Sequence, residues 1–281
     1  MTHAIASLGE IAGRYDAVLS DVWGVIHDGK AAFPEACAAL ARFRATSGPV
    51  LLLSNAPRPG DDVVKLLDQL GVPRDAYDGI LTSGDATRAE MVRRGASAFH
   101  HIGPERDRTV WEGLPTREVQ LTSAEFILCT GLFDDERETP DDYAETLATA
   151  REAKLSMICA NPDIQVHRGS KLIWCAGALA AAYEKLGGEV IYFGKPHPPV
   201  YDTALKRLTG IKGAALEPSR ILAIGDGLRT DILGANRVGV DALFVTAGIH
   251  GEQFADADVN VAAALAEQEL FAAAYQARLK W

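Results

Sequence analysis

The sequence predicts an α/β fold: a doubly wound parallel sheet with a second, smaller α/β unit inserted into it. Short apolar runs alternate with helical stretches along the chain, and continuous apolar runs are typical of parallel strands covered by helices on both faces. A different set of runs interrupts this series in the middle third. The length of 281 residues also exceeds the usual size of one compact domain, so we expect two.

The first series of runs is expected to form the main sheet. Its strands are predicted in AVLSDVWG (17–24), PVLLLSN (49–55), GILTSG (79–84), EVIYFGK (189–195), RILAIGDG (220–227) and DALFVTAG (241–248). Helical patterns lie between them over 34–46, 61–71, 199–208 and 230–239. Pro34 and Pro199 stand near helix starts, where proline is favoured. The Ala-rich segment 261–281 predicts a further helix.

The second series of runs is expected to form the inserted unit. Its strands are predicted over 96–103, 125–131, 155–161 and 171–176, and its helices over 141–154 and 175–187. The first series resumes after Gly188. We therefore expect residues 97–190 to form an inserted α/β domain, and residues 1–96 and 191–281 to form the core domain together.

Composition limits the class of partner. The chain has 28 basic and 38 acidic residues, a net charge of −10 and no basic run, which argues against nucleic acid and against an anionic membrane surface. No apolar run approaches the ~20 residues of a membrane helix, and the first residues lack the pattern of a signal peptide. The four scattered cysteines suggest buried thiols. We expect a soluble cytoplasmic protein that binds a small ligand.

Polar residues stand at the ends of the predicted core strands. Ligands bind at the carboxyl ends of the strands in open α/β sheets, so these positions are the first candidates for a site. The residues at or just after the strand ends are Asp21, Ser54, Asn55, Lys195, Asp226 and Asp231. Any one of them alone would more often be a helix cap or a turn residue. Their joint occurrence at strand ends indicates a functional site.

This set of residues contains the parts of a phosphoryl-transfer site. Such a site needs a carboxylate that can attack phosphorus, oxygen ligands for Mg²⁺ and fixed donors on the phosphate oxygens. Asp21 would attack, and Asp226 would help to hold Mg²⁺. Ser54 and Lys195 would steady the transferring group. Backbone amides could approach it closely at three glycines, Gly24, Gly225 and Gly227.

Four motifs resemble those of the haloacid dehalogenase (HAD) superfamily, and within it the class IIA or NagD-like phosphatases. They are DVWGVIHDG, LLLSN, GKP and GDGLRTD. The segments LTSGDAT (81–87), CANPD (159–163) and CAGAL (175–179) are similar to this branch as well. The resemblance covers nearly the whole chain. It implies a Rossmann-like HAD core with an inserted C2-type cap domain, which would correspond to residues 97–190.

The resemblance also implies roles for the residues. Asp21 would be the nucleophile that forms an aspartyl-phosphate. Mg²⁺ would bind Asp21, Asp226 and the main-chain carbonyl of Trp23, with Asp231 supporting the metal site. Ser54 and Lys195 would bind the phosphate, together with Trp23, Gly24 and Asn55. In such enzymes the cap selects the substrate, and its polar candidates here are Asn161, Asp163, His167 and Arg168.

Trp23 departs from the family pattern. Family phosphatases resemble one another in having a second Asp two residues after the nucleophile, which protonates the leaving oxygen, and its loss would cost typically ~10²–10⁴-fold in rate. Three explanations stay open. A neighbour such as His27, Asp28 or His197 could supply the proton; the substrate could have a leaving group that needs none, as in an acyl or enol phosphate; or the chain could bind phosphate and hardly turn over.

Two other classes fit the sequence less well. A true dehalogenase has no need of Mg²⁺, which leaves the acidic pair at 226 and 231 unexplained, and a response-regulator receiver is shorter and has its acids in another order. We therefore expect a Mg²⁺-dependent phosphatase acting on a small phosphorylated metabolite such as a sugar phosphate or nucleotide. The alternative is a catalytically weakened phosphate-binding or regulatory protein. The cap strands could pair two chains in a homodimer.

Overall fold

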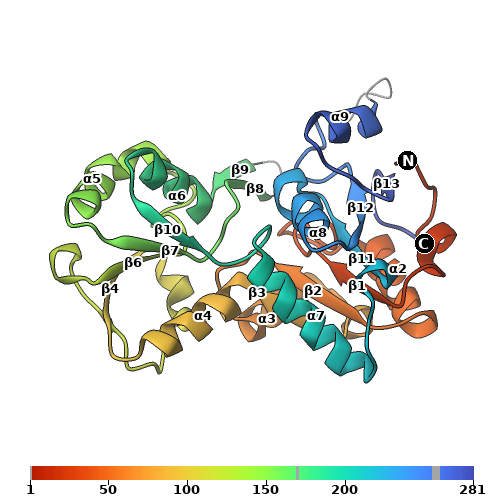
Figure 1. The fold of residues 1–281 in the computed structure, drawn as a ribbon, viewed down its shortest axis with the longest axis horizontal. Coiled ribbons are helices and arrows are strands. Elements are labelled where there is room, and N and C mark those ends of the chain that lie inside the picture. The colour runs from red at the N-terminus through yellow and green to blue at the C-terminus, as the bar shows by residue number, and fades with distance from the viewer. Residues whose placement is uncertain (1, 169–170, 255–259) are drawn as a thin grey trace. The chain divides into compact units, whose positions relative to one another are not determined.

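The chain folds into two compact units. The computed structural model describes residues 2–168, 171–254 and 260–281 (Figure 1). The first unit comprises residues up to 54, 64–81 and 195–281, and the second comprises 55–63 and 82–194. The chain therefore leaves the first unit and returns to it. None of the helices in the described ranges is long and apolar enough to cross a membrane.

The first unit is built on a six-stranded sheet with the order β13-β12-β11-β1-β2-β3. Its strands are β1 (Ala17–Ser20), β2 (Val50–Ser54), β3 (Gly79–Thr82), β11 (Ile221–Gly225), β12 (Asp241–Val245) and β13 (Ala274–Gln276). β1 pairs in parallel with both β2 and β11, and Ser20 lies opposite Leu52 and Ile224. The carboxyl ends of these three central strands therefore meet at one edge of the sheet.

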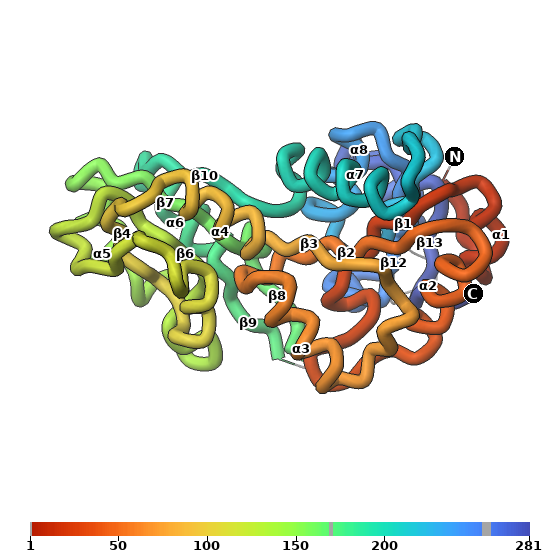
Figure 2. The backbone as a smooth tube through the Cα atoms, turned by 90° about the horizontal axis from the view of Figure 1, so that it is seen from below, coloured from red at the N-terminus to blue at the C-terminus, as the bar shows by residue number. Residues whose placement is uncertain are grey.

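Helices cover both faces of this sheet, as the continuous apolar runs predicted. Leu51 and Leu53 share one apolar cluster with residues of α7 (Pro198–Lys212), α8 (Leu233–Arg237) and α9 (Val261–Glu267), and Figure 2 shows α7 and α8 on the same side of β1 and β2. Leu52 alternates with them and is also fully buried, so it faces the opposite side. There α2 (Pro34–Thr46) packs on β2. The chain also forms α1 (Gly9–Ala12) and α3 (Gly60–Leu70).

The second unit has its own parallel sheet, with the order β10-β7-β6-β4-β5. Its strands are β4 (Ala98–Ile102), β5 (Arg117–Glu118), β6 (Phe126–Cys129), β7 (Ser156–Cys159) and β10 (Glu189–Tyr192), and a separate antiparallel pair is formed by β8 (Gln165–Arg168) and β9 (Lys171–Trp174). Apolar residues of α5 (Ala144–Glu152) and α6 (Ala176–Lys185) pack on β6 and β7. Met91 of α4 (Ser83–Arg94) packs in the other cluster of this unit.

Three expectations about elements were wrong. The run EVIYFGK was expected in the main sheet, but β10 pairs with β7 in the second sheet, because an apolar run does not show which sheet it joins. The run 171–176 forms a strand of the antiparallel pair instead of the parallel sheet. The segment 261–281 is helical only to Glu267 and then adds β13 to the main sheet, so tertiary pairing overrides the helix propensity of alanine there.

Candidate active site

Asp21 lies directly after β1, at the edge where the central strands end. Its backbone N–H donates to the carbonyl of Ile224 at 2.7 Å, and Ser20 Oγ donates to the Asp21 carbonyl at 2.8 Å. Pairing with β11 therefore continues through Asp21 and fixes its backbone. The residue is only 8 % exposed. The sheet thus holds a carboxylate rigidly in a buried position.

Two further acids gather around Asp21. Asp226 follows β11, and Asp231 lies in a short π-helical turn, Leu228–Ile232. One carboxylate oxygen from each of the three acids lies within 4.8 Å of the others, and all three residues are buried. The backbone N–H of Ile249 donates to Asp226 Oδ2 at 2.7 Å. Three buried carboxylates with oxygen atoms this close form a potential site for a hard cation.

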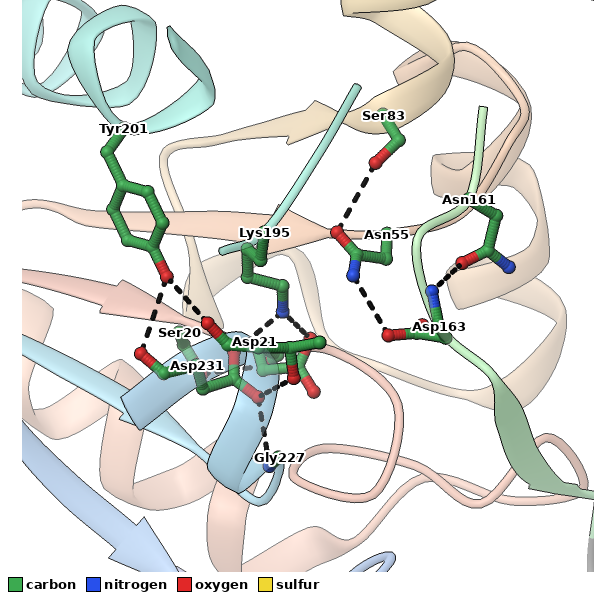
Figure 3. A network of polar contacts seen from close by, with 11 residues as sticks. Ser20, Asp21, Asn55, Ser83, Asn161, Asp163, Lys195, Tyr201, Gly227 and Asp231 are labelled. Atoms are coloured by element: carbon green, nitrogen blue, oxygen red, sulfur yellow. Dashed lines mark hydrogen bonds and ion pairs between the residues drawn. The ribbon is translucent and has the colours of Figure 1, made fainter. Parts of the chain in front are cut away.

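Lys195 links two of these acids. Its Nζ donates to Asp21 Oδ1 at 2.5 Å and to Asp231 Oδ1 at 2.7 Å, and Figure 3 shows the ammonium between the two carboxylates. The Lys195 side chain is 3 % exposed. The other oxygen of Asp231 accepts from the Gly227 N–H at 3.1 Å. Both oxygens of Asp231 are thus bonded within the protein, which suits a supporting position in the site.

The charges of this cluster do not balance. Three carboxylates face one ammonium. Burial, and then the neighbouring charge of Asp231, raise the pKa of Asp21 to about 7 in spite of Lys195. Burial and the charges of Asp21 and Asp231 raise the pKa of Asp226 well above its usual range. A divalent cation would remove this repulsion, so the donor set fits one.

Gly24 leaves room for Asp226. It adopts φ +83°, and a Cβ there would lie 2.1 Å from Asp226 Oδ2, so both the backbone conformation and the space require glycine. The Gly24 N–H donates to the His27 carbonyl at 2.8 Å. This bond closes the turn after Trp23. The turn therefore approaches the acidic cluster through backbone atoms.

The Trp23 side chain packs within its own loop. Its ring lies against Gly29, where a Cβ would come within 2.6 Å of Trp23 Cη2. It also meets the His27 ring edge-on, with centroids 5.0 Å apart. The indole thus serves as a packing group for residues 23–29. The main-chain carbonyl of Trp23 is the group expected to bind a metal, and every residue type supplies such a carbonyl at this position.

The neighbours of Trp23 are held by the same loop. His27 is 1 % exposed, its Nδ1 accepts from the Gly29 N–H at 2.9 Å, and burial lowers its pKa to about 4. Asp28 Oδ1 accepts from the backbone N–H groups of Ala31 and Lys30, which lower its pKa. His197 directly precedes α7 and is half-buried. His27 and Asp28 therefore have structural roles in the turn.

The remaining candidates fall into two groups. Ser54 ends β2 and is 6 % exposed. Asn55, Asn161 and Asp163 belong to the second unit and are joined there by hydrogen bonds. His167 and Arg168 lie on β8, and the Arg168 guanidinium pairs with Asp135 at 2.9 Å.

Three contacts of the site were not expected from the sequence. The backbone N–H of Ile249 donates a hydrogen bond to Asp226. Tyr201 Oη lies 3.4 Å from the carbonyls of Thr230 and Asp231. Ser83 donates to Asn55. Ile249 and Ser83 follow the ends of β12 and β3, so inspection of every strand end would have found both segments. No sequence signal marks Tyr201.

Several known proteins are similar to this chain. A family model described as haloacid dehalogenase-like hydrolase matches residues 18–114, and one described as HAD-hydrolase-like matches residues 192–268. The crystal structure of a haloacid dehalogenase-like family hydrolase from Brucella suis 1330 is 44 % identical, with a TM-score of 0.88 over 97 % of this chain and 98 % of that chain. This chain belongs to the haloacid dehalogenase-like hydrolases. The resemblance predicted from the four motifs is thereby confirmed.

Other HAD proteins extend the comparison. Ribonucleotide monophosphatase NagD of Escherichia coli (strain K12) is 27 % identical over 239 residues, which cover 83 % of this chain and 88 % of NagD. A possible sugar phosphatase of the HAD superfamily from Cytophaga hutchinsonii is 19 % identical, with a TM-score of 0.82 over 98 % of both chains. The second likeness shows the fold alone. The similarity to NagD supports the class IIA branch that the motifs indicated.

Proposed function

We propose that this HAD protein is a Mg²⁺-dependent phosphatase that hydrolyses the monoester of a small phosphorylated metabolite. The observation that carries the proposal is the buried cluster at the strand ends, where Asp21 contacts Lys195 beside two further acids. The names of its relatives support the same reaction, since NagD is a ribonucleotide monophosphatase and another relative an acid sugar phosphatase. A sugar phosphate or a nucleotide is the substrate class we favour.

Mg²⁺ would bind at Asp21, Asp226 and the Trp23 carbonyl, with Asp231 as support. The fit rests on three buried carboxylates that face a single ammonium among the residues the structure describes, and on oxygen donors, which Mg²⁺ prefers. When bound, the ion supplies positive charge to the phosphate and lowers the repulsion between the acids.

The residues of the chain account for the remaining chemistry. An Asp21 oxygen attacks phosphorus, the bond from phosphorus to the ester oxygen breaks, and an aspartyl-phosphate forms. Ser54 and Lys195 hold the phosphate oxygens, with the backbone of Gly24 and Asn55 close by. Water then attacks phosphorus, which releases inorganic phosphate and restores the carboxylate. Lys195 favours the ionised form of Asp21, because its ammonium lowers the pKa that burial and Asp231 raise.

Trp23 limits the range of leaving groups that the protein could release. Its indole cannot give a proton to the leaving oxygen, and His27 and Asp28 already bind backbone N–H groups of their own turn. A sugar phosphate or a nucleotide would therefore need another proton donor, whereas an acyl or enol phosphate would need none, because its leaving group departs without a proton. His197 stays as the other proton donor to test. The second candidate function, a phosphate-binding or regulatory protein with little turnover, is favoured by the same residue.

The second unit would act as the cap, the role expected for residues 97–190. Asn161 and Asp163 would recognise the part of the substrate beyond the phosphate. The homodimer and the cytoplasmic location stay predictions. No nucleic acid or membrane partner is proposed.

A phosphate-release screen tests the function. Sugar phosphates, nucleotides, pyridoxal phosphate and acyl phosphates are each supplied with and without Mg²⁺. We expect steady release from at least one class, dependent on Mg²⁺. Release of one leaving group per chain, with the phosphate retained on the protein, would favour the binding protein, and no release from any class would contradict the phosphatase.

A further inference from the structure

A chain of hydrogen bonds runs through the second unit. Ser83 Oγ donates to Asn55 Oδ1 at 3.3 Å, Asn55 Nδ2 donates to Asp163 Oδ1 at 2.9 Å, and the Asp163 N–H donates to Asn161 Oδ1 at 3.0 Å (Figure 3). Ser83, Asn55 and Asn161 are 0 %, 4 % and 8 % exposed. The chain thus links the first residue of α4 to the segment that we propose for substrate recognition.

The direction of these bonds follows from the chemistry of the groups. An ionised carboxylate only accepts, so Asp163 requires the amide nitrogen of Asn55. The amide oxygen of Asn55 then faces Ser83, and the hydroxyl must donate to it. A rotated amide would place its oxygen against the Asp163 carboxylate, which is repulsive. Ser83 and Asp163 therefore select the same orientation of Asn55 from its two ends.

Ser83 and Asn55 also lie against Gly194, the residue before Lys195 in the chain. Gly194 has φ +122°, and a Cβ there would lie 2.0 Å from Ser83 Oγ and 2.6 Å from Asn55 Oδ1. Asn55 follows Ser54 in the chain, and Gly194 precedes Lys195. Ser83 thus touches the residues bonded covalently to two of the proposed phosphate ligands.

We infer that Ser83 is a positioning residue for substrate selection: its hydroxyl orients the Asn55 amide, which in turn holds Asp163 and the segment Asn161–Asp163. The inference rests on the proposed function, because this segment affects turnover only in a phosphatase whose second unit reads the substrate. Without the hydroxyl, Asn55 loses the hydrogen bond from Ser83, and Asp163 is held less firmly. Loss of the Ser83 hydroxyl should therefore weaken recognition of the leaving group by the segment Asn161–Asp163.

The test compares two hydroxyls of the same helix. Thr87 lies one turn after Ser83 in α4, is 0 % exposed, and its Oγ1 has no hydrogen-bond partner among the described residues. Ser83→Ala and Thr87→Val therefore remove equally buried hydroxyls, of which only the first is bonded. Ser83→Cys replaces the hydroxyl with a somewhat larger thiol that is a weaker donor, and it is used if Ser83→Ala does not fold.

The substrates are p-nitrophenyl phosphate and 4-methylumbelliferyl phosphate, with Mg²⁺ present. Both leaving groups are acidic phenols, so they differ in size more than in their need for a proton. We expect Ser83→Ala to raise KM by roughly 3- to 10-fold, the effect of one lost hydrogen bond, to change the preference between the two esters and to leave kcat nearly unchanged. Ser83→Cys should fall between, and Thr87→Val should match the wild type.

A double variant separates positioning from general damage. If Ser83 acts through Asp163, adding Ser83→Ala to Asp163→Ala should change KM and ester preference no further, whereas independent roles would add. Additive effects, or a wild-type KM and preference in Ser83→Ala, would overturn the inference and leave the proposed function intact. If the wild type hydrolyses neither ester, the same variants are compared on the substrates that release phosphate in the screen; no release from any class would contradict the proposed function, and the inference would fall with it.

Discussion

Two aspartates, the buried Asp21 of the first unit and the half-buried Asp135 of the second, show opposite electrostatic situations. Asp21 shares one ammonium with Asp231 and lies beside Asp226, and its pKa is raised to about 7 by burial and then by the charge of Asp231. Asp135 pairs with two guanidinium groups, those of Arg106 and Arg168. Burial would raise the pKa of Asp135 too, but the two arginines together bring it below its usual range.

The difference separates a site from a structural ion pair. The charge of Asp135 is matched by arginine side chains of the same unit, so no further cation is needed to stabilise it. The acids around Asp21 are left with excess negative charge, which destabilises the fold unless a cation binds. Unbalanced buried charges of this kind are found mainly at functional sites. The imbalance, more than the number of acids, points to the active site.

The largest expected effect comes from the nucleophile. Asp21→Asn should lower turnover by about 10⁴-fold or more, because an amide oxygen does not attack phosphorus. Asp135→Asn removes a half-buried, ion-paired carboxylate from the other unit and should leave kcat nearly unchanged. Phosphate release measures both. With beryllium fluoride and Mg²⁺, the wild type should also form an adduct on Asp21. Steady hydrolysis by Asp21→Asn would mean that water attacks directly.

Metal affinity should separate the two regions next. Asp226→Asn replaces a charged oxygen ligand with a neutral one, so Mg²⁺ affinity should fall by about 10- to 100-fold. Asp107→Asn is the control, because Asp107 is a buried acid of the second unit with Arg58 at 3.7 Å. Isothermal titration with Mg²⁺ should show wild-type affinity in this control. Unchanged binding in Asp226→Asn would remove that residue from the metal site.

Varying the leaving group of the substrate tests whether Trp23 has replaced a proton donor. Without a proton donor, aryl and acyl phosphates should be hydrolysed faster than alkyl phosphates. The rate ratio should exceed that of an enzyme with an intact acid by up to the ~10²–10⁴-fold that such an acid contributes. Rates for esters of falling leaving-group pKa measure the slope. Trp23→Asp should flatten it, provided that the cavity left beside Gly29 and His27 does not displace the turn.

A shallow slope in the wild type would instead point to a substitute acid. His197→Ala, compared with His27→Ala and Asp28→Ala on an alkyl phosphate, would then identify it. Of the three, we expect His27→Ala to lose stability as well, because that ring is buried and accepts the Gly29 N–H.

Strand ends were the part of the site that the sequence could predict. Asp21, Asp226 and Lys195 are ionisable residues after apolar runs, and the parallel register brings them together. The contact from Ile249 could not be predicted by residue type, because every residue except proline offers the same backbone N–H. The Ser83 contact was missed because a serine at a helix start is ordinarily read as a cap.

The fold was predictable where periodicity decides it. α2 begins at Pro34 and ends at Thr46, as its pattern indicated. β10 was assigned to the wrong sheet because its apolar residues suit either one, and its partner β7 lies about thirty residues earlier in the chain. The strand β13 lies in an Ala-rich segment that local propensity reads as helix. In both cases the deciding interaction is distant in sequence.

The smallest effect concerns acid stability in the second unit. Because the folded-state pKa of Asp135 lies below its usual value, this carboxylate stabilises the fold above about pH 4, and the stabilisation is lost as the pH falls through the folded-state pKa. Asp135→Asn lacks the titrating group, so its melting temperature should fall less between about pH 5 and 3 than that of the wild type. The difference should be about 0.5–1 kcal/mol, since the pairs are partly exposed. Asp134→Asn is the control, because Asp134 is more exposed and its ion pair with Arg137 is longer, at 3.6 Å. An equal acid-induced loss in Asp135→Asn and the wild type would mean that the two arginines do not stabilise this carboxylate, and the contrast with Asp21 would then rest on the first unit alone.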